Sequence, residues 1–293
     1  MAEPYPHRIP WEEIERAARR DAEVLPAAPL VSVDWDFFLP LPDLSHLPDE
    51  RAELLAAGAG FYLEEWFSAR RQAREWTELA DRLRALGAKP EDLWSVEPRV
   101  AALDELRRRF RFRRAWVGDS HLWGACVAAR KHAESGEPVE LLSLDAHHDL
   151  GYLNYRGDDE ERSRKRAWER PSCDDWIQAG LRHGAISRAE IVYPDWRDLD
   201  ELGIASPTLP EEFEHRVSYR TFEAWRLSPA PLEHQEADLL VVRSSAYSHP
   251  FGEADRLFLE LADDLAAGEW ACLDCHGPLA IGAQDACRPR RAS

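Results

Sequence analysis

Short apolar strands that alternate with helical segments constrain the fold of this chain more than any other feature. Residues 30–33, 139–144 and 237–242 are apolar runs of strand length, and segments of helical spacing separate them. Such alternation is typical of βαβ units, in which parallel strands are covered by helices on both faces. We therefore expect an α/β protein, a three-layer αβα sandwich around a mostly parallel sheet.

The same periodicity predicts the remaining elements. Strands are expected over residues 114–117 and 190–194, and helices over 11–24, 100–109, 174–183 and 253–267, with an alanine-rich helix that ends near residue 134. The charged stretch 157–170 is expected to form a surface loop. Residues 39–100 combine prolines with helical composition, and we expect them to form a helical insertion or cap within a single domain spanning 1–293.

The charge balance restricts the classes of partner. The chain holds 37 Lys and Arg against 55 Asp and Glu, a formal net charge of −18. Because nucleic-acid phosphates are neutralised by basic side chains, this balance argues against a nucleic-acid partner. It suits a cationic partner better, although acidic composition also serves solubility.

Membrane and export signals are not apparent in the sequence. No apolar run approaches the roughly 20 residues that a membrane helix needs, and the first residues lack a basic and apolar leader. Five cysteines, an odd number, are expected to be reduced thiols. We expect a cytoplasmic protein with no membrane contact, and the sequence leaves a homo-oligomer open.

Two acidic motifs follow predicted strands directly. Asp34-Trp35-Asp36 follows one strand, and Asp145-Ala146-His147-His148-Asp149 follows another. Ligand sites of open α/β sheets lie beyond the carboxyl ends of the strands. If these segments are extended, alternate side chains share a face, so Asp34 pairs with Asp36, and Asp145 with His147 and Asp149. His121 follows a third predicted strand and adds an imidazole.

Such a cluster favours a pair of divalent metal ions. Carboxylates beside a buried strand are costly unless positive charge lies among them. Oxygen-rich donors with one or two imidazoles favour manganese, iron or magnesium over structural zinc. The alternative is that these residues only cap the following helices, and for His121 that it is a cap or a partly buried donor.

The motifs resemble those of a known family. Asp145-Ala146-His147-x-Asp149 resembles the DAHxD signature of the arginase and agmatinase ureohydrolases, within the arginase–deacetylase superfamily. The segment 116–124 resembles their strand-GGDHS-helix element, and Asp34-x-Asp36 their DxD ligand pair. With Asp36-Phe37-Phe38 and the segment 173–177, the closer likeness is to peptide arginases, which convert arginine in ribosomally made peptides to ornithine.

The resemblance implies a fold, a cofactor and ligand roles. It implies an arginase-like fold that holds two Mn²⁺ per chain, circularly permuted because the DxD pair here precedes DAHxD. Asp145 and Asp34 would bridge the ions, with His121 and Asp149 completing one site and His147 and Asp36 the other. Ser120 stands between the Gly-Asp pair and His121, so a water is the alternative ligand there. The implied reaction is hydrolysis of arginine to ornithine and urea.

Further residues are assigned to the reaction as candidates. His148 and His249 are candidates for the proton donor to the leaving amine, although each also suits a structural role. Asp174, Asp175 and Glu253 are candidates for binding the guanidinium, although each also suits a helix start. The expected substrate is an arginine-containing peptide or another guanidino compound. Two alternatives remain: a deacetylase-like amide hydrolase of the same superfamily, and a non-catalytic, metal-dependent peptide-binding protein.

Overall fold

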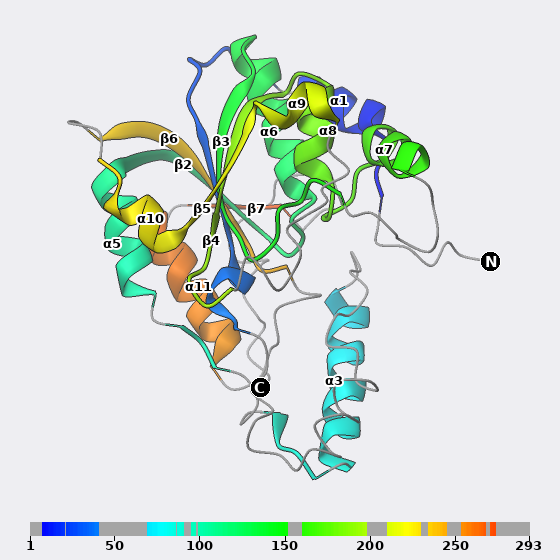
Figure 1. The fold of residues 1–293 in the computed structure, drawn as a ribbon, viewed down its shortest axis with the longest axis vertical. Helices are drawn as coiled ribbons and strands as arrows, with labels where there is room; N and C mark the ends of the chain where they lie inside the picture. The colour runs from blue at the N-terminus through cyan, green and yellow to red at the C-terminus, as the bar shows by residue number, and fades with distance from the viewer. Residues whose placement is uncertain are drawn as a thin grey trace.

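A seven-stranded sheet forms the centre of the molecule. The computed structural model describes residues 8–20, 22–40, 69–85, 87–90, 95–97, 99–151, 160–197, 210–229, 234–244, 253–267 and 270–273. Within these residues the strand order is β5-β4-β3-β1-β6-β2-β7, and every pairing is parallel (Figure 1). The strands are β1 (Leu30–Asp34), β2 (Phe110–Gly118), β3 (Val139–Leu144), β4 (Ile186–Tyr193), β5 (Val217–Thr221), β6 (Gln235–Val242) and β7 (Ala271–Cys272).

Helices lie on both faces of the sheet (Figure 1). One face is covered by α1 (Trp11–Arg20), α6 (Trp123–Ser135), α8 (Trp176–Arg182) and the short α9 (Glu211–Glu214). The other face is covered by α5 (Val100–Arg109), α10 (Phe222–Leu227) and α11 (Ala254–Leu265). Each face has its own apolar core, so the expected α/β architecture with a parallel sheet is confirmed.

The burial of the central strands explains their composition. All five residues of β1 are buried, and the last six residues of β6, from Ala237 to Val242, are buried as well. A parallel strand that is covered on both faces reads as a continuous apolar run rather than an alternating one. This is why the middle of the sheet is the part most readily predicted from the sequence.

Two charged or weakly apolar regions differ from expectation. Residues 160–169 form a helix, α7 (Glu160–Glu169), so the loop predicted over 157–170 is wrong there. This helix contains the (i, i+4) ion pair Lys165–Glu169, and it buries Ala167. Few buried side chains are therefore needed to hold this highly charged segment in a helix. The edge strand β5 was not predicted, because its pattern is mostly exposed.

The segment 39–100 is described only in part. Its longest described element is α3 (Ala69–Ala85), which agrees with the expected helical content. Whether the segment acts as a cap stays a prediction. Within the described residues, no helix is long and apolar enough to cross a membrane. Cys126 and Cys173 are free, but Cys272 is disulfide-bonded, so the expectation of five reduced cysteines is wrong at that position.

A buried ion cluster ties the sheet to α6. Asp238 of β6 is fully buried and accepts hydrogen bonds from Arg113 and Arg114 of β2 at 3.1 and 2.9 Å, and from Lys131 of α6. Burial alone would raise the pKa of Asp238, but these hydrogen bonds lower it to about 2. One carboxylate therefore holds two neighbouring strands and a helix together through three cations.

We predict that Asp238→Ala lowers the free energy of unfolding by about 3–5 kcal/mol, because it leaves the buried ammonium group of Lys131 without its carboxylate partner. The matched control is Glu140→Ala, which breaks the exposed β3–β4 pair with Arg188 and should cost at most about 1 kcal/mol. Urea denaturation at pH 7 measures both values. Since the pKa of Asp238 is 3.8 in its reference state and about 2 when folded, its contribution is lost as the pH falls from about 4 through 2. Equal costs for the two variants would contradict this prediction.

Candidate metal centre

The predicted ligands meet at the carboxyl edge of the sheet. Asp34 is the last residue of β1, and Asp36 lies in the 3₁₀ helix η1 (Trp35–Phe38) that follows it. His121 comes after β2, and Asp145 comes directly after β3. All four side chains are at most 3 % exposed, so they form a buried polar cluster in an otherwise apolar interior.

Two overlapping triads organise the cluster. The donor atoms of Asp34, His121 and Asp145 lie within 4.8 Å of one another, and so do those of Asp36, Asp145 and His147. Asp145 belongs to both triads. A carboxylate has two oxygens, so a shared Asp145 can serve two adjacent ions, one in each triad.

His121 turns one ring nitrogen towards three carboxylates. Its Nδ1 lies 3.1 Å from Asp34 Oδ2, 3.1 Å from Asp145 Oδ2 and 2.7 Å from Asp149 Oδ2. The opposite nitrogen, Nε2, lies 2.8 Å from the hydroxyl of Ser32 on β1. If Nε2 carries the proton and donates to Ser32, the lone pair of Nδ1 faces the carboxylates, which is the arrangement of a metal-binding histidine.

His147 has the same role in the second triad. Its Nδ1 lies 2.7 Å from Asp36 Oδ2 and 3.7 Å from Asp145 Oδ1. It is the most accessible member of the cluster, with 18 % of its side chain exposed. This side of the centre is therefore the one closest to solvent.

The carboxylate oxygens of the cluster are placed where a cation could bind. Asp36 Oδ2 and Asp145 Oδ2 are buried, and apart from the facing Nδ1 atoms of His147 and His121 neither has a hydrogen-bond partner within the described chain. Buried acceptors are normally satisfied, and an unsatisfied carboxylate oxygen is costly. Together with two imidazole nitrogens, these oxygens form a hard, oxygen-rich donor set that fits divalent ions of the manganese or magnesium type.

The two motifs converge through turns and not through extended chain. The expectation of alternating side chains is wrong for both, because Asp36 lies in a 3₁₀ turn and the chain bends at Ala146 and His147. Backbone groups hold the bends: the amide of Asp36 donates to Asp34 Oδ1 at 3.3 Å, and the amide of His147 to Asp145 Oδ1 at 2.7 Å. The amide of Ala146 donates to Asp36 Oδ1 at 3.3 Å and so joins the two motifs.

A local turn accommodates the additional residue Ser120. Its hydroxyl accepts a hydrogen bond from the amide of Leu122 at 3.2 Å, and its carbonyl accepts one from Trp123 at 3.2 Å. This turn directs the ring of His121 into the cluster before α6 begins. The structure therefore brings His121 to Asp34 and Asp145 through this turn.

Asp149 lies at the border of the cluster. Its carboxylate contacts His121, but it belongs to neither of the two triads. Its φ of 50° places it in the left-handed region, which is costly for a residue other than glycine. A strained residue held beside the buried acids indicates a constraint from the site and not from the fold alone.

The charges of the cluster change the pKa values of Asp34, Asp145, His121 and His147. Burial and the charge of Asp36 raise the pKa of Asp34 to about 6, and burial with Asp149, Asp36 and Asp34 raises that of Asp145 well above its usual range. Burial opposes protonation of the histidines, yet the facing carboxylates raise the pKa of His121 strongly and that of His147 to about 9. The site therefore demands positive charge, from protons or from metal ions.

Three supporting residues were not predicted as such. Ser244, after β6, donates to Asp34 Oδ2, and Ser32 contacts His121. Trp176, at the start of α8, donates from Nε1 to Asp149 Oδ2 at 2.7 Å, and its ring centre lies 5.0 Å from that of His121. Ser32 shares a face of β1 with Asp34, two residues away, so strand alternation could have identified it.

The other predicted site residues have varied environments. His148 is buried and its Nδ1 accepts a hydrogen bond from the amide of Leu150 at 3.0 Å. Asp175 is held by an ion pair with Arg8 at 2.8 Å and by the amide of Ser172 at 2.7 Å. Asp174 is buried and accepts from Cys173 at 3.3 Å, and Glu253 pairs with Arg256 at the exposed start of α11. His249 lies outside the described residues.

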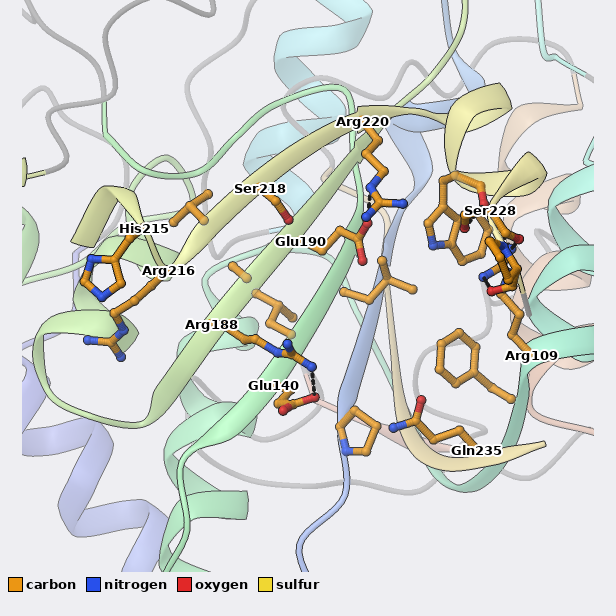
Figure 2. A pocket seen from close by; sticks show the side chains of 18 residues that line it. Arg109, Glu140, Arg188, Glu190, His215, Arg216, Ser218, Arg220, Ser228 and Gln235 are labelled. Atoms are coloured by element: carbon orange, nitrogen blue, oxygen red, sulfur yellow. Dashed lines mark hydrogen bonds and ion pairs between the residues drawn. The ribbon is translucent and has the colours of Figure 1, made fainter. Parts of the chain in front are cut away.

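A separate hollow of about 730 Å³ lies over the amino-terminal parts of β3, β4 and β5, away from the metal centre (Figure 2). Its charged side chains are already paired: Arg188 with Glu140, and Arg220 with Glu190, each at 2.8 Å. Arg109 and Arg216 donate to backbone carbonyls around it. The charged side chains of the hollow are therefore already held by ion pairs or by backbone carbonyls, whereas the acids of the metal centre face one another.

Fold and site together define an α/β protein with a parallel sheet and two buried His/Asp triads that could hold metal ions. Comparison with protein families, curated proteins and solved structures finds no match to the chain. The function is therefore inferred from the residues of the centre.

We predict that the wild-type protein binds two Mn²⁺ per chain, whereas Asp145→Ala binds none, because both triads lose a donor. Asp36→Ala should retain at most one ion, because only the second triad contains Asp36. Elemental analysis after manganese reconstitution and gel filtration measures the content, with Glu140→Ala as the surface control. Two ions retained by Asp145→Ala would show that the triads are not the binding site.

Trp176→Phe is predicted to weaken manganese binding by about 10- to 100-fold while leaving the chain folded. The variant removes the hydrogen bond to Asp149 together with the outer indole atoms that pack against Gly124, and it keeps an aromatic ring in the apolar core. Competition with a chelating dye measures the affinity. The matched control, Trp270→Phe, loses a comparable bond to Asp263 at 2.9 Å and should keep wild-type affinity. Equal losses in both variants would contradict a specific role for Trp176.

Proposed function

We propose that this protein is a binuclear manganese hydrolase that cleaves the guanidino group of arginine, within a peptide, to give ornithine and urea. The observation that carries the proposal is the pair of His/Asp triads that share Asp145. A single-metal amide hydrolase needs one such triad, whereas this chain has two in contact.

The proposed ligand sets follow the contacts. Asp34, His121 and Asp145, with Asp149 beside them, would hold one ion, and Asp36, Asp145 and His147 the other. Two divalent ions in such a centre supply the activation of water for hydrolysis at neutral pH. A strong nucleophile is required because the carbon of a guanidinium, bonded to three nitrogens, is poorly electrophilic.

The arrangement of strands supports the resemblance to ureohydrolases. β1 and β3 are neighbours in the sheet, with Val33 opposite Leu144, so the motifs that follow them meet although they are far apart in the chain. Their order along the chain is then without consequence for the site. A circularly permuted, arginase-like fold is part of the proposal on this ground.

The chain's own residues can be assigned further tasks. Hydrolysis breaks a carbon–nitrogen bond, and the leaving ornithine nitrogen takes up a proton. Burial lowers the pKa of His148 to about 4, and its Nδ1 accepts a backbone hydrogen bond, so it is neutral with its proton on Nε2. We assign it as a hydrogen-bond donor in the site, and His249 as the proton donor to the leaving amine.

The proposed substrate is a cationic peptide, which suits the net charge of −18. Asp174 remains a proposed partner of the substrate guanidinium. Asp175 and Glu253 are weaker choices, because the ion pairs with Arg8 and Arg256 already use their charge. The proposed setting is the cytoplasm.

We predict that the manganese-loaded protein releases urea from arginine-containing peptides and that the peptide loses a CH2N2 unit for each arginine converted. A coupled urea assay and mass spectrometry of the peptide measure the two products. Asp145→Ala should reduce turnover by at least about 10³-fold, because both ions are lost. Glu140→Ala should retain wild-type turnover.

Two other outcomes would reassign the protein. Urea from free arginine but never from peptides would keep the chemistry and reject the peptide substrate. Acetate released from acetylated amines, with no urea from any guanidino compound, would make the protein a deacetylase-like hydrolase. Manganese-dependent peptide binding without any product would make it a binding protein.

A further inference from the structure

The turn after β4 lies beside the metal centre and is anchored to both ligand-bearing segments. The carbonyl of Val192, near the end of β4, accepts a hydrogen bond from the amide of Asp145 at 3.1 Å. Trp196 Nε1 donates to the carbonyl of Phe37 at 3.0 Å, one residue after Asp36. On the outer side, Asp195 Oδ1 accepts from the amide of Glu223 at 2.9 Å and so fixes the turn to α10.

This turn brings the guanidinium of Arg197 to the accessible side of the centre. The amide of Arg197 donates to the carbonyl of Pro194 at 3.1 Å, which closes the turn. The guanidinium carbon lies 5.7 Å from the centre of the Tyr193 ring, over the last residue of β4. Its positive charge lies close enough to interact with the imidazoles of both His147 and His148. Arg197 therefore faces the part of the cluster that is closest to solvent.

Arg197 has no acidic partner in the described part of the chain. Its Nε is buried and makes no hydrogen bond there, and no described carboxylate forms an ion pair with it. Two other arginines near buried acids are paired: Arg8 with Asp175, and Arg114 with Asp238 and Glu134, whereas Arg216 is satisfied by backbone carbonyls. In a chain with 18 more acidic than basic residues, an unpaired guanidinium beside a buried site is unexpected.

A guanidinium beside the centre disfavours the binding of a substrate that carries positive charge and no negative charge. Two like charges held close together in a partly dry site repel each other. The same group strongly favours a carboxylate, because its planar donors match two carboxylate oxygens. An anionic group of a ligand would therefore satisfy the unmet hydrogen-bonding capacity of Arg197.

We propose that Arg197 binds a carboxylate of the substrate, so that the preferred substrate carries this group close to the guanidino group that is hydrolysed. This inference rests on the proposed function and narrows its substrate. Two sources offer the same chemistry: the α-carboxylate of a carboxyl-terminal arginine, or an Asp or Glu side chain beside an internal arginine.

The test uses matched peptides that differ only in this carboxylate. One pair is a peptide that ends in arginine, as the free acid and as the amide. The second pair is amidated and has Arg-Asp or Arg-Asn in its interior. The manganese-loaded wild type should show a KM at least about tenfold lower for the acid in one of the two pairs. The pair that responds identifies the source of the carboxylate.

The variants assign this preference to Arg197. Arg197→Gln should abolish the ratio of KM values between acid and neutral peptides, and Arg197→Lys should restore it in part, because the charge remains but the paired donors are lost. Manganese content should equal that of the wild type in both variants. The matched control is Arg188→Gln, which removes an equal charge from the other end of β4 and should keep the wild-type ratio.

Failure of this inference is distinguishable from failure of the proposed function. Urea released equally well from acid and neutral peptides keeps the chemistry and rejects the role of Arg197, as does a preference that persists in Arg197→Gln. With no urea from any peptide, calorimetric titration of the same peptides decides: tighter binding of an acid peptide that Arg197→Gln abolishes keeps the role of Arg197. Binding without that difference, or no binding at all, rejects it.

Discussion

Four carboxylates, those of Asp34, Asp36, Asp145 and Asp149, meet where β1 and β3 end, and hardly any of their surface reaches water. Each buried charge loses several kcal/mol of hydration, and like charges at this spacing repel. Apolar packing of the two cores has to compensate this cost. The backbone hydrogen bonds within the two motifs offset part of this cost, and positive charge from protons or from metal ions would offset more. The cluster therefore destabilises the fold unless positive charge lies among its acids.

The middle of the sheet could be predicted from the sequence because its strands are buried on both faces. β1, β3 and β6 appear as uninterrupted apolar runs, and the acidic motifs mark where two of them end. The edges could not be predicted in the same way. β5 is largely exposed and shows little alternation of apolar and polar residues. α7 is held by charge pairs and a few buried side chains, which the local hydrophobicity of the sequence does not predict.

The candidate site was predictable in its composition but not in its geometry. The residue types and their places after strands predicted that Asp34, Asp145 and His147 lie close together. Their actual contacts depend on a 3₁₀ turn and a bend, which the spacing of the residues does not predict. His121 reaches the cluster through a turn made by Ser120. Arg197 lies more than 40 residues from either motif and carries no motif of its own, so only the folded turn after β4 reveals its position.

The strand order also sets a sequence of events during synthesis. β1, at residues 30–34, pairs with β3 at residues 139–144 and with β6 at residues 235–242. As the ribosome makes the chain from its amino terminus, more than one hundred further residues are added after β1 before β3, its first neighbour, is complete. Contacts between residues so far apart in the chain form slowly, and until they form the strand edge stays unpaired and prone to aggregation. Leu30, Val31 and Val33, which are fully buried in the folded protein, therefore lack their β3 neighbours until residue 144 has been made.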